Sequence, residues 1–290
     1  ISDNQCEVTF IANAASCSLS VYNLRESDKP TEIKTELACT NNSIENKNLI
    51  VSIDSNGDIC SVFDKRINRE LISKPIRMAV LNNTHSFDWP AWEVIYDDLC
   101  GEPYMYPTNP DVSIVDNGPA ICSIKIIRKA GMSTFTQIIS LDSESEFVSV
   151  HNETDWREEA SLLKAQFSLT AENELASYDI GIGATKRATN TKSLCEVPAQ
   201  EWADITNDDE SFGVSVFSDS KYGWIMKDDH TLKLTIVHSP KNWFRDDSVQ
   251  AMLDFGLNRY GYAIFSHKGK VGKETQLNAR IFERPFTAFI

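Results

Sequence analysis

The sequence is poor in positive charge. Its 290 residues carry 28 Lys and Arg against 42 Asp and Glu, which gives a formal net charge of −14 at pH 7. A protein that binds a nucleic-acid backbone needs Lys and Arg clustered against the phosphates. The charge therefore excludes a basic reader of nucleic acid, and it is compatible with a neutral partner such as a sugar.

Long hydrophobic runs are also absent. A membrane-spanning helix needs about 20 predominantly apolar residues, whereas an apolar run such as 121–127 is short and interrupted by Lys125. The first ten residues have no charged segment followed by an apolar core, so we expect neither a secretory signal nor a membrane partner. The chain starts at Ile1 and not at a methionine, and we interpret it as part of a longer protein.

Paired cysteines and short catalytic motifs are missing as well. The seven cysteines are an odd number and none stands in a C-x-x-C pair, whereas disulfide frameworks favour even counts and zinc sites favour close pairs. We therefore expect reduced thiols, a cytoplasmic location and no metal site in this chain. There is no H-x-x-x-H or G-x-S-x-G motif, and 181–189 lack the spacing of a phosphate loop.

What the sequence has in quantity is strand-like segments. Two alternating runs, 49–54 and 59–63, flank an Asn56-Gly57 step, which is the strongest short-range signal of a β-hairpin. Further strand-like runs are 76–81, 112–115, 121–128, 134–141, 147–151, 163–169, 212–217, 232–237, 262–266 and 277–282. So many short strands with almost no helix predict an all-β fold, a large antiparallel β-sandwich. The run 161–169 fits a helix as well as a strand.

Two polar, turn-rich segments, 24–34 and 40–43, indicate a linker. They follow a strand-like start at 8–10 and 18–22, and they precede the main body of the chain, which begins at about residue 46. We therefore expect a short first unit joined to one large β domain.

The candidate chemistry is concentrated in one aromatic and acidic segment. Asp88, Trp89, Trp92 and Glu93 lie within a few residues of one another. Indole faces cover the CH patches of a pyranose while carboxylates accept hydrogen bonds from its hydroxyls, which favours a sugar-binding surface. The alternatives are core tryptophans beside solvated acids, or the two carboxylates of a glycosidase, which need a specific separation. Arg187, close to a glycine-rich turn, is a second candidate for contact with a ligand oxygen.

Several phrases, taken in order, resemble a known family. They are Val51-Ser52-Ile53-Asp54-Ser55-Asn56-Gly57-Asp58, Phe87-Asp88-Trp89-Pro90-Ala91-Trp92-Glu93, Asp155-Trp156-Arg157-Glu158, and Lys186-Arg187-Ala188-Thr189-Asn190-Thr191 followed by Glu196-Val197-Pro198-Ala199-Gln200-Glu201-Trp202. The series runs from about 44 to 267 and resembles the C-terminal β region of glycoside hydrolase family 38 α-mannosidases, of the bacterial and cytosolic-vacuolar kind. The order of the phrases is more specific than any one of them.

The resemblance implies a division of the chain and a role. Residues 1–43 would be the end of a preceding small β domain plus a linker, and 44–290 a C-terminal supersandwich domain like that of galactose mutarotase. The zinc ligands, nucleophile and general acid of the family lie in a catalytic domain that this chain lacks. Zinc is therefore expected there, and this chain alone is expected to be inactive. The longer protein would hydrolyse terminal α-mannosyl linkages with retention.

The resemblance also implies site residues and partners. Arg187, in its R-x-T setting, would contact the substrate, while Asp88, Trp89 and Trp92 would lie near the sugar pocket. The expected partners are an α-mannoside oligosaccharide, the catalytic domain and, in a homo-oligomer, further copies of the chain. A stand-alone carbohydrate-binding sandwich is the first alternative, and a mutarotase-like isomerase is a weaker one. The sequence departs from the family at Asn258, where a histidine is common.

Overall fold

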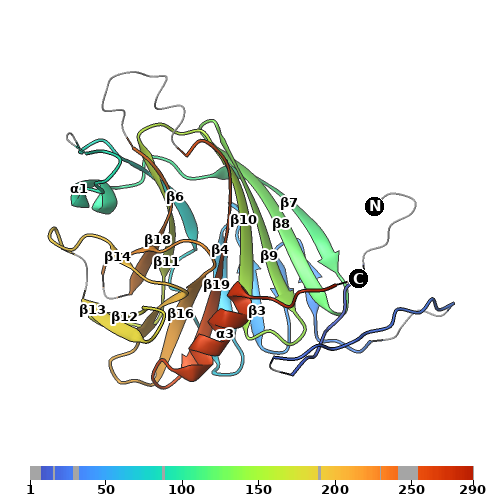
Figure 1. The fold of residues 1–290 in the computed structure, drawn as a ribbon. Helices are drawn as coiled ribbons and strands as arrows, with labels where there is room; N and C mark the ends of the chain where they lie inside the picture. The colour runs from blue at the N-terminus through green and yellow to red at the C-terminus, as the bar shows by residue number, and fades with distance from the viewer. Residues whose placement is uncertain are drawn as a thin grey trace.

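The protein forms three antiparallel sheets (Figure 1). A computed structural model describes residues 8–15, 17–28, 33–86, 89–188, 191–228, 230–240 and 254–289. The first sheet has the order β1-β2-β3-β4-β5, with β1 Ala38–Thr40, β2 Ser43–Glu45, β3 Leu49–Ile53, β4 Ile59–Asp64 and β5 Arg69–Glu70. The second has the order β13-β12-β15-β16-β19-β10-β9-β8-β7, with β7 Thr108–Asn117, β8 Ile121–Ala130, β9 Ser133–Asp142, β10 Phe147–Trp156, β12 Leu175–Asp179, β13 Ala184–Ala188, β15 Trp202–Thr206, β16 Phe212–Ser218 and β19 Gly256–Lys268. The third has the order β14-β17-β18-β11-β6, with β6 Arg77–Asn82, β11 Ser161–Ser168, β14 Val197–Pro198, β17 Gly223–Met226 and β18 Thr231–Ser239.

The hairpin predicted around Asn56-Gly57 is confirmed in the first sheet, where it joins β3 to β4. Gly57 has a φ of +77°, in the left-handed region that favours glycine. A Cβ at this position would lie 2.9 Å from Ile126 Cγ2 and 2.9 Å from Pro110 Cβ, both in the second sheet. The turn therefore needs glycine for its backbone and also for its close approach to the neighbouring sheet.

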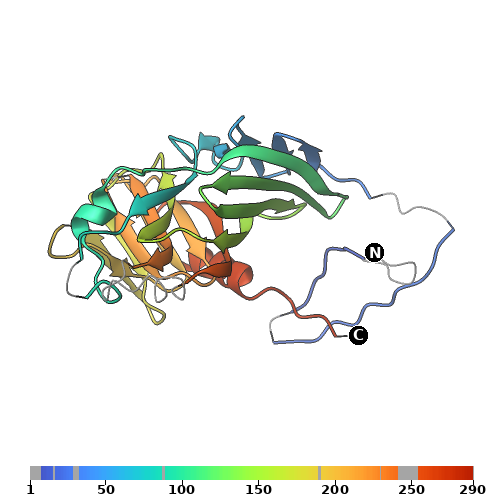
Figure 2. The same ribbon diagram turned by 90° about the horizontal axis from the view of Figure 1, so that it is seen from above.

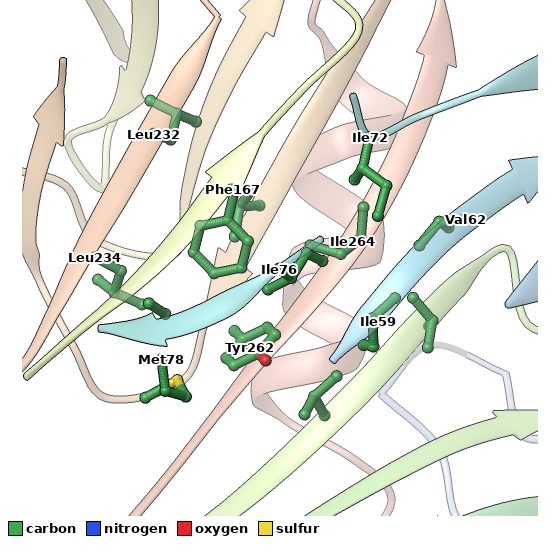
Figure 3. Packing of buried hydrophobic residues seen from close by; sticks show 14 of the residues in the cluster. Ile59, Val62, Ile72, Ile76, Met78, Phe167, Leu232, Leu234, Tyr262 and Ile264 are labelled. Carbon is green, nitrogen blue, oxygen red and sulfur yellow. The ribbon is translucent and has the colours of Figure 1, made fainter. Parts of the chain in front are cut away.

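Both smaller sheets lie on the same face of the nine-stranded sheet, as Figure 2 shows from above. A single hydrophobic core contains inward-facing residues of all three sheets. Figure 3 shows Ile59 of β4, Phe167 of β11 and Tyr262 of β19 within it, and the rings of Phe167 and Tyr262 meet edge to face with centroids 5.1 Å apart. Alternate residues of β11 and β19, among other strands, enter this core. The predicted large antiparallel β-sandwich is confirmed.

The opposite face of the nine-stranded sheet is covered in part by helix α3, Lys273–Glu283 (Figure 1). Its buried residues Thr275, Ala279 and Phe282 recur at spacings of four and three, the period of a helix. Ala279 and Phe282 pack against aromatic side chains of β15, β16 and β19. The strand expected at 277–282 is wrong, because so short an apolar run does not reveal whether its period is helical.

Two further predictions concern the run 161–169 and the strand-like start of the chain. The run 161–169, left open between helix and strand, contains β11, because Leu163, Ala165 and Phe167 alternate into the core. The strand-like start is wrong, since 8–10 and 18–22 form no strand in the structure. An alternating run becomes a strand only where another strand pairs with it. In the described part of the chain no helix is long and apolar enough to cross a membrane.

Candidate functional site

Arg187 lies on β13, the edge strand of the nine-stranded sheet, opposite Ala176 of β12. Its Nη1 donates a hydrogen bond to the backbone oxygen of Pro198 at 3.0 Å. The guanidinium also lies over the ring of Tyr178, with its central carbon 5.3 Å from the ring centroid. These two contacts hold the arginine against the sheet edge while its side chain stays half-buried.

The surroundings of Arg187 leave its charge unmatched. Among the residues that the structure describes, no carboxylate lies within ion-pair distance of its guanidinium. Tyr178 beneath it is fully buried, and its hydroxyl has no hydrogen-bond partner in the described structure. Burial raises the pKa of Tyr178, so the ring stays neutral and offers no counter-charge. Arg187 is therefore a positioned cation available to a ligand oxygen.

Trp89 and Trp92 lie in the long connection between β6 and β7. Their side chains are exposed, Trp89 by 50% and Trp92 by 75%, and their rings meet edge to face with centroids 5.7 Å apart. A turn holds the pair, because the backbone N–H groups of Trp92 and Glu93 both donate to the oxygen of Trp89, at 2.9 and 2.8 Å. The core alternative for these tryptophans is thus wrong. Asp88 lies outside the described residues.

A buried carboxylate holds the same connection in place. Asp98 in helix α1, Tyr96–Cys100, is 3% exposed. It accepts hydrogen bonds from the backbone N–H groups of Thr84 at 3.3 Å and His85 at 3.1 Å, and it contacts His85 Nδ1 at 2.6 Å. The hydrogen bond to Asp98 and then its charge raise the pKa of His85. Leu99, next along the helix, is fully buried against the third sheet. The connection that carries the tryptophans is therefore packed onto this sheet.

The segments that carry Arg187 and the tryptophans meet at one end of the sandwich. Cys195 Sγ donates to the backbone oxygen of Val94 at 3.4 Å, and Lys192 Nζ lies 3.7 Å from Asp97 Oδ1. In Figure 1 helix α1 and strands β12 to β14 lie at this end. No direct contact joins Arg187 to either tryptophan among the described residues. We call the exposed surface formed by Arg187, Trp89 and Trp92 the rim.

A buried ion pair anchors the segment that follows Arg187, and sequence reasoning missed it. Lys164 of β11 is fully buried, and its Nζ lies 3.0 Å from Glu196 Oε1. Thr235 hydrogen-bonds to both groups. Burial by itself would raise the pKa of Glu196, but the charge of Lys164 and these hydrogen bonds lower it. The only signal in the sequence was a lysine within the apolar run of 162–167.

In the described ranges no three His, Cys, Asp or Glu side chains gather as a metal site would require. The described residues include six free cysteines, and among these six only Cys122 is buried.

Residues 44–247 match the family described as "Glycosyl hydrolases family 38 C-terminal domain". The chain is 28% identical over 266 residues to alpha-mannosidase G of Dictyostelium discoideum. This alignment covers 84% of the chain and 23% of that protein. It is 26% identical over 221 residues to an alpha-mannosidase of Saccharomyces cerevisiae, covering 71% of this chain and 19% of that protein. The chain thus spans less than a quarter of the length of these curated relatives.

A solved structure supports the fold. The crystal structure of an alpha-mannosidase from Enterococcus faecalis superimposes with a TM-score of 0.69 at 15% identity, covering 88% of this chain and 33% of that one. At this identity the likeness shows the fold alone. The family match covers well over half of the chain, from within β2 to a point beyond the end of β18. The chain therefore belongs to the family of C-terminal domains of family 38 glycosyl hydrolases.

Proposed function

We propose that this chain is the C-terminal β domain of a longer α-mannosidase and that its exposed end forms one wall of the sugar site. The observation that carries the proposal is Arg187, a half-buried guanidinium held by Pro198 and Tyr178 without a carboxylate partner among the described residues. Family membership supports the substrate class, because both curated relatives are named alpha-mannosidases.

Each side chain of the rim has a distinct role in this proposal. Arg187 donates charge-assisted hydrogen bonds to sugar oxygens. Trp89 and Trp92 cover the apolar face of a pyranose ring of an α-mannoside oligosaccharide with their exposed indoles. The contact between Cys195 and Val94 keeps the two segments together. An open rim of this kind suits a wall that another domain completes.

The bond-breaking chemistry belongs, in this proposal, to a catalytic domain outside this chain. That domain would hold the zinc ion and the catalytic carboxyl groups, and the longer enzyme would hydrolyse terminal α-mannosyl linkages with retention of configuration. A cytoplasmic location fits the free cysteines of the described residues. The anomer formed first from an aryl α-mannoside, observed by proton NMR, tests retention, and a β-anomer would contradict it.

The assignment of catalysis to another domain can be tested on the isolated chain. An activated aryl α-mannoside is incubated with it, with and without zinc, and release of the aryl group is followed. We expect no turnover above background in either case. Clear turnover that scales with protein concentration would contradict the assignment of catalysis to another domain.

One observation favours a second function, that of a stand-alone carbohydrate-binding sandwich. The exposed tryptophan pair is held by its own turn and needs no second domain. Calorimetric titration with mannose and short α-mannosides discriminates the two functions. Binding at millimolar or tighter affinity that Trp92→Ala abolishes favours the stand-alone function, and absence of binding favours a wall that is incomplete alone.

A further inference from the structure

A second polar site lies on the outer face of the third sheet and shares no residue with the rim of Arg187 and the tryptophans. It is a cavity of about 410 Å³ between the β3–β4 turn, the connection that precedes β7, and strands β6, β11 and β18. A volume of this size accommodates a small polar metabolite. Its lining is rich in charged and hydrogen-bonding side chains, including Arg77, Gln166 and Lys233.

Lys233 is the feature that points to a ligand. It lines the cavity and is only 2% exposed. Among the described residues nothing forms an ion pair or a side-chain hydrogen bond with its ammonium group. Burying an ammonium without a counter-charge is costly. Burial first, and then the charges of Lys227 and Lys164, lower the pKa of Lys233 to about 8.

The register of the sheet places two more donors beside Lys233. Gln166 of β11 stands directly opposite Arg77 of β6 on one side and Lys233 of β18 on the other. Directly opposite residues point to the same face of a sheet. Arg77 donates Nε to Asp58 Oδ2 at 3.0 Å and lies 3.8 Å from the centroid of the Tyr106 ring. Its two terminal nitrogens have no partner among the described residues and stay available.

Of the row, Arg77 is paired with Asp58, whereas no carboxylate of the lining forms an ion pair with Lys233 among the described residues. Each carboxylate already contacts a cation, an imidazole or a backbone donor: Asp54 the N–H of Asn56, Asp58 the guanidinium groups of Arg77 and Arg128, Glu102 the ammonium of Lys227, and Asp228 the ring of His230. Within the described ranges Asp54 and Asp228 have no lysine or arginine partner, so the lining as a whole is not cationic, and the positive charge without an ion pair in the row lies at Lys233. It comes with neutral donors next to it, since Ser168 and Thr231 form the adjacent cross-strand pair.

We infer that this cavity binds a phosphoryl oxyanion, either as inorganic phosphate or as the phosphate group of a sugar phosphate. The guanidinium fork of Arg77 matches two phosphate oxygens. Lys233 supplies the compact charge, and Gln166 supplies a neutral N–H donor between them. A divalent cation would be repelled by this row, and a neutral sugar would leave Lys233 without a counter-charge.

The test is a titration of the chain, in buffer free of phosphate and sulfate, with inorganic phosphate, mannose 6-phosphate and mannose, followed by calorimetry and by amide NMR shifts. Lys233→Met removes the charge at similar volume. Gln166→Glu places a carboxylate beside Lys233, where it can form an intramolecular ion pair with the ammonium. Lys129→Met, at an exposed position of β8, is the matched control. Circular dichroism verifies that every variant is folded.

We expect both phosphates to bind and to shift amides of β6, β11 and β18. Lys233→Met and Gln166→Glu should each weaken binding about tenfold or more, as loss of one charge-assisted contact implies, while Lys129→Met should not. Tighter binding of mannose 6-phosphate than of phosphate would identify the sugar phosphate as the ligand, and equal binding would identify the phosphoryl group alone. No saturable phosphate binding, or equal binding by wild type and Lys233→Met, would overturn the inference.

Discussion

Replacing Lys233 by methionine should stabilise the protein below pH 8. The Lys233 side chain is buried in β18, and its ammonium forms no ion pair among the described residues, although the charge of Glu102 partly offsets the effect of burial. Burial and the neighbouring ammonium groups of Lys227 and Lys164 lower its pKa from 10.5 to about 8. Each unit of pKa corresponds to 1.36 kcal/mol, so the folded state carries a penalty of up to about 3 kcal/mol for holding this proton. Methionine keeps the buried aliphatic stem and removes the charge.

The sign of the pH dependence follows from the direction of the shift. Between about pH 8 and pH 10.5 folded Lys233 has released a proton that the unfolded chain still binds. The stability of the wild type therefore rises with pH across this window. Below it the penalty is complete, and above it the penalty is gone. The advantage of Lys233→Met should thus be largest at pH 7 and should vanish near pH 10.5.

Urea unfolding of wild type, Lys233→Met and Lys129→Met at pH 7 and pH 10 measures this difference. Phosphate and sulfate are left out of the buffers, since an anion bound beside Lys233 would offset the penalty. We expect a gain in unfolding free energy of about 1 to 3 kcal/mol for Lys233→Met at pH 7 and a smaller gain at pH 10. A less stable Lys233→Met at pH 7, or a gain that is independent of pH, would refute the reasoning.

Three further predictions concern other parts of the structure. Glu196→Gln leaves the buried ammonium of Lys164 without its charge partner, and urea unfolding should show a loss of about 3 kcal/mol; an unchanged midpoint would contradict the buried pair. Gly57→Ala adds a Cβ at a left-handed φ and should cost more than about 1 kcal/mol in thermal unfolding. NMR titration should place the pKa of His85 above 6.5, with a return towards it in Asp98→Asn; its contribution to stability is complete below that value and is lost as pH rises through the raised pKa.

The sequence predicted most of the strands, because alternation and turn signals are local. The hairpin at Asn56-Gly57 needs only a dozen neighbouring residues to be recognised. Strands β12 to β15 were not predicted, since their runs are short and each forms a strand only through pairing with another strand of its sheet. The error at 277–282 has the same origin: only the aromatic surface beneath α3 shows which residues of that run must face inward.

The candidate site was predictable in part, because some of its residues are recognisable from local sequence alone. Trp89 and Trp92 stand out by composition, and Arg187 by its family phrase. Their relation to one another is set by contacts between segments about 100 residues apart, such as the hydrogen bond from Cys195 to Val94. The buried partners of Lys164 and the isolation of Lys233 depend on strand order, which composition and periodicity do not give.

The most direct test of the central claim is made in the longer α-mannosidase that we propose contains this domain. The measurement is kcat/KM for an activated aryl α-mannoside, with Arg187→Ala compared against Lys186→Ala at the exposed neighbouring position. Loss of a charge-assisted contact of 1.5 to 3 kcal/mol predicts a decrease of about 10- to 100-fold for Arg187→Ala and little change for Lys186→Ala. A folded Arg187→Ala enzyme with unchanged kcat/KM would contradict the account.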